Sequence, residues 1–204
     1  MNFENFLYKL ISRTKKMIRD IIFNKTRIAK YALLSTCSQV KGRPIKNGPV
    51  LLHGKGIISF GRSVKLGYKD SPFFYSGYVY LEARNIQSKI EIHADVQINN
   101  NTAIISEGTG GIIIGAGTLI GTGVTIYDSD FHELTSSRRI GGNPETAAVI
   151  IGKNVFIGSG VTILKGVTIG DNSVIGSGAV VNASIGDNVI AAGNPCRVIK
   201  PLTL

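Results

Sequence analysis

The segment 151–181 reads IGKNVFIGSGVTILKGVTIGDNSVIGSGAVV, and an aliphatic residue returns in it at every sixth position. A spacing of six keeps these side chains on one strand face, whereas the glycine-, asparagine- and serine-rich triplets between them are typical of turns. The chain must therefore bend once per hexad, and three bends close a triangular coil. The aliphatic positions are Ile151, Ile157, Ile163, Ile169, Ile175 and Val181.

This period predicts a parallel β-helix in which each coil stacks on the one before it at a spacing of about 4.8 Å. With 25 glycines and no tryptophan, the composition agrees with such a solenoid. Small or β-branched residues four places after the aliphatic positions would fill the prism corners. The expected stacked pairs are Ile151 with Ile169, Ile157 with Ile175, and Ile163 with Val181. The expected corner residues are Val124, Val155, Val161, Val167, Ser173 and Ala179.

The period continues upstream, and its interruptions are informative. A short turn insertion explains the longer step around residues 107–111, while the polar segment 127–149 has no aliphatic periodicity and predicts a loop that leaves one corner. Long loops on rigid scaffolds commonly carry function, and this one contains His132. The upstream positions are Phe60, Leu66, Ile86, Ile92, Ile98, Ile104, Ile114, Ile120 and Ile126.

In these residues the chain resembles the hexapeptide-repeat acyltransferases, and among them the galactoside and maltose O-acetyltransferase type. The resemblance covers residues 86–204. It is carried by the repeats of 155–181, by AAGNPCRVIK at 191–200, and by the histidine that follows DSDF. It implies an all-β solenoid with left-handed coils, acetyl-CoA as co-substrate, a carbohydrate acceptor, and a homotrimer with active sites between subunits.

The resemblance implies that His132 is the general base that takes the acceptor proton. The residue type suits the role, since the unperturbed histidine pKa of about 6.5 leaves it neutral and basic at cytoplasmic pH. Asp128, Asp130 or Glu133 could hold the other ring nitrogen, and the sequence does not choose between them. The alternative for His132 is a solvated loop residue.

Other site residues follow from the same resemblance. Asn101 and Asn99 match an asparagine site beside the acceptor and thioester, although asparagine ladders also stabilise β-solenoids. The Ser159 amide matches an oxyanion donor. Phe156 stands where the galactoside enzymes have tryptophan. The remaining positions expected to contact coenzyme A are Ser177, Asn182, Arg197 and Lys200.

The acceptor cannot be carried over, because no helical acceptor domain of the sugar acetyltransferases is recognisable in residues 1–56. One expected coenzyme contact is also lost, since Ala183 stands where the family often has lysine. We expect a hydroxyl of a bacterial surface polysaccharide, such as capsule or lipopolysaccharide, or of its lipid-linked precursor. The alternatives are a small free sugar, an amino sugar, serine or an antibiotic, and a non-catalytic scaffold.

Residues 1–46 form a segment distinct from the β-helix domain 47–204. They hold eleven Lys or Arg against Glu4 and Asp20, out of a net charge of +10. Their apolar residues recur near helical spacing, which predicts a basic amphipathic helix or helix pair. Such a helix would lie on an anionic membrane, pack on the prism, or dock an acidic polysaccharide.

Several classes are disfavoured. No run of eighteen apolar residues predicts a membrane span, no secretory signal is recognisable, and two distant cysteines suit a reducing compartment, so we expect a cytoplasmic protein. His53, His93 and His132 lack the spacing of the zinc-binding carbonic anhydrases of this fold, so no metal is expected, nor is nucleic acid. The aromatic segment 70–80 either caps the prism or lines an acceptor site.

Overall fold

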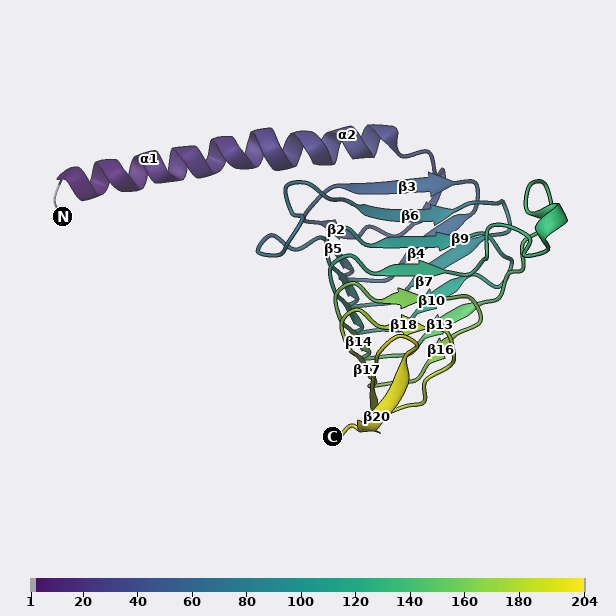
Figure 1. The fold of residues 1–204 in the computed structure, drawn as a ribbon. Coiled ribbons are helices and arrows are strands. Elements are labelled where there is room, and N and C mark those ends of the chain that lie inside the picture. The colour runs from purple at the N-terminus through teal and green to yellow at the C-terminus, as the bar shows by residue number, and fades with distance from the viewer. Residues whose placement is uncertain (1–2, 204) are drawn as a thin grey trace.

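The computed structural model describes residues 3–203 and forms a triangular parallel β-helix that tapers toward its C-terminal end (Figure 1). Three sheets make its walls, here named A, B and C. Sheet A contains β1 (Gln39–Lys41), β4 (Ile57–Phe60), β7 (Lys89–Ile92), β10 (Ile112–Ile114), β13 (Val149–Ile151) and β16 (Thr168–Ile169). Sheet C contains β3 (Val50–Gly54), β6 (Val79–Ala83), β9 (Ala103–Ser106), β12 (Thr125–Tyr127), β15 (Thr162–Ile163) and β18 (Val180–Val181).

Sheet B has the same parallel stacking and also closes the C-terminal end. Its last strand, β20, runs antiparallel to β19, unlike the parallel pairs before it. The sheet contains β2 (Ile45–Lys46), β5 (Lys65–Leu66), β8 (Gln97–Ile98), β11 (Leu119–Ile120), β14 (Phe156–Ile157), β17 (Val174–Ile175), β19 (Val189–Ala192) and β20 (Arg197–Pro201).

The predicted aliphatic ladders form the core. Ile151 pairs with Ile169, Ile157 with Ile175, and Ile163 with Val181, as expected from the period of six. All six side chains are fully buried, and so are the predicted small residues at the corners. The stacked coils therefore bury their apolar side chains between layers, as the sequence predicts.

One upstream position was predicted wrongly. Ile86 is 71% exposed and lies outside the core, because residues 84–88 form a bend between β6 and β7. The Ser88 hydroxyl oxygen accepts a hydrogen bond from the Asn85 amide in this bend, at 3.1 Å. The ladder passes instead through Ile90 and Ile92 of β7, both buried.

The prism also starts earlier than expected. β1 pairs with β4 and β2 pairs with β5, so residues 39–46 already belong to the first coil although we assigned them to the N-terminal segment. These strands are two or three residues long and exposed, and the period of six is not visible in them.

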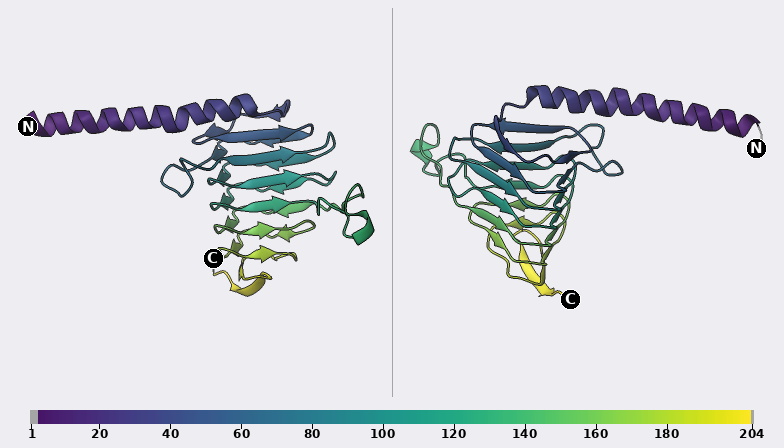
Figure 2. Two further views of the ribbon diagram at one scale, coloured as in Figure 1. Left: turned by 45° about the horizontal axis from the view of Figure 1, so that its top comes forward. Right: turned by 180° about the vertical axis from the view of Figure 1, so that it is seen from behind.

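The expected N-terminal helical segment is present as one rod across the N-terminal end of the prism (Figures 1 and 2). It consists of α1 (Phe3–Asp20), a π-helical turn (Ile21–Lys25) and α2 (Thr26–Leu34). α2 packs on β3, while α1 projects beyond the prism. No helix among the described residues is long and apolar enough to cross a membrane.

Two loops leave the corners. Residues 68–78 fold out between β5 and β6 and contact α2, because Arg27 donates hydrogen bonds to the carbonyl oxygens of Phe74 and Gly77. The aromatic segment is thus held against α2 at the N-terminal part of the molecule. The second loop joins β12 to β13 and carries a short 3-10 helix, Ser136–Arg138.

Candidate active site

The predicted coenzyme residues gather along sheet B and the corner that joins it to sheet C. Asn99 and Asn101 follow β8, Ser159 follows β14, and Ser177 follows β17, so they occupy the same corner in three coils, with the coil of β11 between the first two. Hydrogen bonds from Gly160 to Thr122 and from Gly178 to Ser159 link this corner from coil to coil. The set forms a continuous edge of the prism.

A pocket of about 490 Å³ lies beside this edge. Leu119, Ile120 and Phe156 give it an apolar floor, and Phe156 is 49% exposed. Lys65 and Asn99 are among the polar residues that line it. An apolar floor with a few polar groups is the usual composition of a small-molecule site.

The three consecutive asparagines have different roles. Asn100, which the sequence analysis did not single out, is 4% exposed, and its side chain binds the amide and carbonyl of Tyr68 and the carbonyl of Pro72. Asn99 donates to the Ser71 hydroxyl at 3.0 Å. Asn101 is exposed and has a φ of 58°. The structural asparagine is therefore Asn100, which leaves Asn101 available to a ligand.

Two glycines allow close stacking of the coils at this corner. A Cβ on Gly121 would lie 2.6 Å from the Ser159 nitrogen, and one on Gly158 would lie 2.6 Å from the Ser177 nitrogen. Both distances are too short for a real side chain. Glycine at these two positions is therefore what allows the coils to stack this closely at the corner.

The loop 127–149 leaves the opposite edge of sheet C, where it turns toward sheet A. Asp128 fixes its start: this wholly buried carboxylate accepts hydrogen bonds from the Ser106 hydroxyl at 2.7 Å, the Glu107 amide at 2.7 Å and the Gly108 amide at 3.2 Å. The loop is thereby tied to the preceding coil. Asp128 therefore fixes the start of this loop, and we refer to its carboxylate with these three hydrogen bonds as the clamp.

Among residues 3–203, none of the three candidates for orienting His132, Asp128, Asp130 and Glu133, forms a hydrogen bond with it. The Nδ1 atom of His132 lies 3.1 Å from the carbonyl oxygen of Arg139 in the same loop. Asp130 lies 3.4 Å from the Lys165 ammonium of the next coil, and Glu133 accepts from the Asn143 amide and pairs with Arg138. Asp128 and Glu133 are thus engaged elsewhere, whereas the buried Oδ2 atom of Asp130 has no hydrogen-bond partner among the described residues and lies near the Lys165 ammonium alone.

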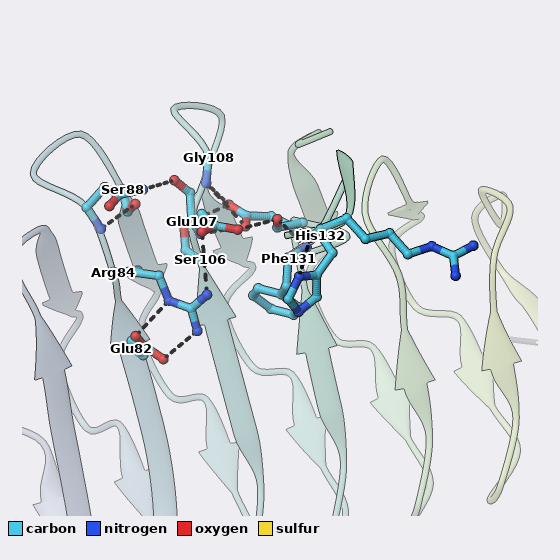
Figure 3. A network of polar contacts seen from close by, with 12 residues as sticks. Glu82, Arg84, Ser88, Ser106, Glu107, Gly108, Phe131 and His132 are labelled. Atoms are coloured by element: carbon cyan, nitrogen blue, oxygen red, sulfur yellow. Dashed lines mark hydrogen bonds and ion pairs between the residues drawn. The ribbon is translucent and has the colours of Figure 1, made fainter. Parts of the chain in front are cut away.

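The contact with Arg139 determines the tautomer of His132. A carbonyl oxygen can only accept, so we assign the proton to Nδ1, which leaves the lone pair on Nε2. His132 is exposed, and Figure 3 shows it at the edge of sheet C beside Phe131. A neutral imidazole with an accessible Nε2 can accept a proton from a bound hydroxyl.

A polar network that the sequence analysis missed supports the same loop. Arg84 binds Glu82 through two nitrogens, at 2.9 and 3.2 Å, and Glu107 at 3.4 Å (Figure 3). Its guanidinium carbon lies 4.8 Å from the centre of the Phe131 ring. Glu107 also accepts a hydrogen bond from Ser129. The network therefore links β6 to the residues directly before His132.

The charges in this network are mutually stabilised. Burial alone would raise the pKa of Glu82, but hydrogen bonds from Arg84 and Tyr80 outweigh it and lower the pKa below the ordinary value. Burial and the hydrogen bond to Glu82 raise the pKa of Tyr80. Glu82 is thus held as a carboxylate although it is only 7% exposed. No sequence motif marked it, since it looks like a surface residue of a short strand.

One chain does not bring all predicted residues together. Asp130, His132 and Asn182 lie toward the edge between sheets C and A, because each follows a strand of sheet C. Arg197 and Lys200 lie on β20 at the end of sheet B. Asn99, Asn101, Ser159 and Ser177 lie on the edge between sheets B and C, and Phe156 lies beside it on β14 of sheet B. Within the described residues no group of three or more His, Cys, Asp or Glu could hold a metal ion.

Comparisons with known proteins agree with this architecture. Residues 148–183 match the family described as bacterial transferase hexapeptide (six repeats). A candidate acetyltransferase of Saccharomyces cerevisiae, YJL218W, is 42% identical over 116 residues, which cover 57% of this chain and 58% of the relative. The galactoside O-acetyltransferase of Escherichia coli is 43% identical over 115 residues, covering 56% and 55%. The chain thus spans less than two thirds of each relative.

Among solved structures, the N-acyltransferase AntD of Bacillus cereus, in complex with dTDP and 3-hydroxybutyryl-CoA, has a TM-score of 0.60. It is 24% identical and covers 89% of each chain, a likeness that supports the fold alone. These findings confirm the left-handed β-helix and the resemblance to the hexapeptide-repeat transferases. One of the two relatives is a galactoside O-acetyltransferase, which agrees with the type that the sequence resembles.

Proposed function

We propose that this chain is an acetyl-CoA-dependent O-acetyltransferase that acts on a sugar hydroxyl of a bacterial surface polysaccharide or its lipid-linked precursor. The observation that carries the proposal is the contact of His132 Nδ1 with the Arg139 carbonyl, which leaves Nε2 as a base. Similarity to the galactoside enzyme supports the acetyl donor and the sugar acceptor. We place the enzyme in the cytoplasm, at the inner face of the membrane, where acetyl-CoA and lipid-linked glycans are both accessible.

The residues have defined tasks in this reaction. His132 Nε2 takes the proton of the acceptor hydroxyl as its oxygen bonds to the thioester carbonyl carbon. The Ser159 amide donates to the oxygen that becomes negative. The carbon–sulfur bond then breaks, and the imidazolium returns the proton to the departing thiolate. Phe156 and the apolar floor of the pocket contact the arm of the coenzyme that carries the thioester. Arg197 and Lys200 bind the phosphates of the coenzyme.

The separation of the two edges supports a homotrimer. The strand β9 and the turn before it span the wall between Asn101 and Ser106, and five residues of extended chain cover about 16 Å. Ser106 binds Asp128 at the start of the His132 loop. Reacting atoms must approach to about 3–3.5 Å. We therefore propose that the His132 edge of one subunit completes the Asn101 edge of its neighbour.

The test measures acetyl-CoA-dependent thiol release with a panel of sugars and oligosaccharides. His132→Asn should lower turnover by about 10² to 10⁴ while coenzyme A affinity, measured by isothermal titration, stays unchanged. His93→Asn, also an exposed histidine in a turn, is the matched control and should keep full turnover. Equal activity of the two variants would remove His132 from the chemistry.

Complementation tests the shared site. Phe156→Asp should abolish coenzyme binding without unfolding the chain, because Phe156 is half exposed. Neither this variant nor His132→Asn should be active alone, but co-expressed chains should regain activity in mixed trimers that join one intact edge from each. If mixed trimers form and stay inactive, the site lies within a single chain and the intersubunit model is wrong.

A further inference from the structure

The N-terminal rod is attached to the prism through polar and aromatic side chains of its C-terminal part. Asn24 donates to the Asn47 carbonyl at 3.2 Å, and Arg27 donates to two carbonyls of the 68–78 loop. The ring of Tyr31 stacks on Tyr78 with centres 4.5 Å apart. These three residues recur at spacings of three and four, so they share one helix face.

The apolar stripe of the rod is not used for this attachment. Its residues in α1 and the π turn are 44 to 58% exposed. The π turn takes more residues per turn than an α-helix, so it rotates the face of α2 that meets the prism relative to the stripe of α1. Within the described residues, nothing covers the stripe. Its members are Leu7, Leu10, Ile11, Met17, Ile18, Ile21 and Ile22.

Cations flank the stripe. Residues 5–34 contain eight Lys or Arg, and Asp20 is their one acidic residue. A second copy of the rod laid on the stripe would bring like charges together, which disfavours self-association. A nucleic acid would match the charge but not the apolar stripe. An anionic bilayer satisfies both features, since apolar side chains enter the acyl boundary while Lys and Arg remain among the headgroups.

We propose that the rod is a peripheral anchor that binds the surface of an anionic lipid bilayer, with the stripe of α1 inserted. The rod lies sideways to the direction in which the coils stack and projects beyond the prism (Figures 1 and 2). The prism therefore stands on the bilayer by its N-terminal end, with its C-terminal end pointing away. The anchoring proposal can fail or hold separately from the proposed acetyl transfer, because lipid binding is measured without acetyl-CoA and without an acceptor.

Tryptophan substitution reports insertion directly, because the chain has no tryptophan of its own. Leu10→Trp places the probe on the stripe, and Ser12→Trp places it on the opposite face of the same turn. With vesicles of phosphatidylcholine containing about one third phosphatidylglycerol, the first probe should shift to the blue and become shielded from iodide. The second should stay in water. Equal behaviour of the two probes overturns the proposed orientation.

A charge-matched pair separates insertion from simple attraction. Ile11→Asp with Ile18→Asp should lower vesicle partitioning by about 100-fold or more, since two buried aliphatic side chains are lost. Asn5→Asp with Ser12→Asp adds the same charge on the polar face and should lower it less than tenfold. Equal losses would show attraction without insertion. Absence of binding of the wild-type protein to anionic vesicles would also overturn the proposal. So would a smaller oligomer of the Ile11→Asp, Ile18→Asp variant than of the wild type in the absence of lipid, since the stripe would then be a contact between subunits.

Discussion

Truncating the buried carboxylate that starts the His132 loop should damage catalysis far more than binding. Asp128→Ala removes the acceptor of the Ser106 hydroxyl and of the Glu107 and Gly108 amides at a site with no solvent exposure. The hydroxyl can turn to another partner, whereas the two amides stay unpaired. At roughly 1–3 kcal/mol for each orphaned group, the variant should lose about 3 kcal/mol of stability.

That loss corresponds to a melting temperature about 9 °C lower for a chain of this size. The functional effect should be larger, because His132 lies four residues beyond the clamp and a misplacement of about 1 Å can cost 10²-fold in rate. We expect kcat to fall about 10²-fold at a temperature where the variant is fully folded. Coenzyme A affinity should stay unchanged, and backbone hydrogen exchange should accelerate in residues 129–147.

Ser173→Ala is the matched control. Ser173 is equally buried at a corner between sheets A and B, where its hydroxyl donates to the Gly186 carbonyl at 2.7 Å and accepts from the Val189 amide at 3.2 Å. Loss of the Ser173 hydroxyl in this variant should lower the free energy of unfolding but leave kcat unchanged. If Asp128→Ala keeps full kcat, the clamp does not position His132. If both variants lose kcat equally, the effect reflects general destabilisation.

Three further predictions concern stability. Glu82→Gln should lower the free energy of unfolding by about 2 kcal/mol at neutral pH, measured by denaturant unfolding. Because folding lowers the pKa of Glu82, the stability difference between wild type and variant should be fully present above about pH 4.3. It should shrink as the pH falls through the pKa of Glu82 in the folded protein. Asn172→Ala removes the two side-chain hydrogen bonds that link Asn172 to Asn154 and to Asn188, and it places alanine at a φ of 59°. It should lower the free energy of unfolding by about 2 kcal/mol in denaturant unfolding, and Asn172→Gly should lower it less because glycine adopts this φ without strain. Ile157→Ala should cost about 3–5 kcal/mol, measured by calorimetry, because its side chain is fully buried between coils. Wild-type stability of any of these variants would contradict the corresponding assignment.

The core was predictable because its signal is local and repeated. Each coil places its aliphatic residue at the same point, so the period of six in residues 151–181 determines the stacking of Ile157 on Ile175 without knowledge of distant contacts. The rule failed at Ile86, where a bend of uneven length shifts the phase. It also gave no signal in β1 and β2, which are too short to show a period.

The partners of the site residues were not predictable in the same way. Asp128, Asp130 and Glu133 all lie within four residues of His132 in the sequence. Their roles depend on which other residues the folded loop contacts. Asp130 pairs with Lys165 of the next coil, a contact that no local pattern reports. The Arg139 carbonyl that holds His132 carries no sequence signature, because every residue has a carbonyl. The proposal of His132 as base follows from a resemblance, whereas the orientation of its ring required the path of the folded loop.

The proposed membrane anchor and the proposed active site together constrain the acceptor. The His132 loop leaves β12, which lies three strands from β3 in sheet C, and coils spaced at about 4.8 Å put it about 14 Å beyond β3. In the proposed arrangement a helix about 10 Å thick lies between β3 and the bilayer, so His132 would lie about 24 Å from the lipid surface. A sugar attached closely to the bilayer cannot reach it, whereas a lipid-linked oligosaccharide can. Acetylation on vesicles should therefore begin only above a minimum glycan length, and modification of a lipid-linked monosaccharide by the bilayer-bound enzyme would contradict this geometry.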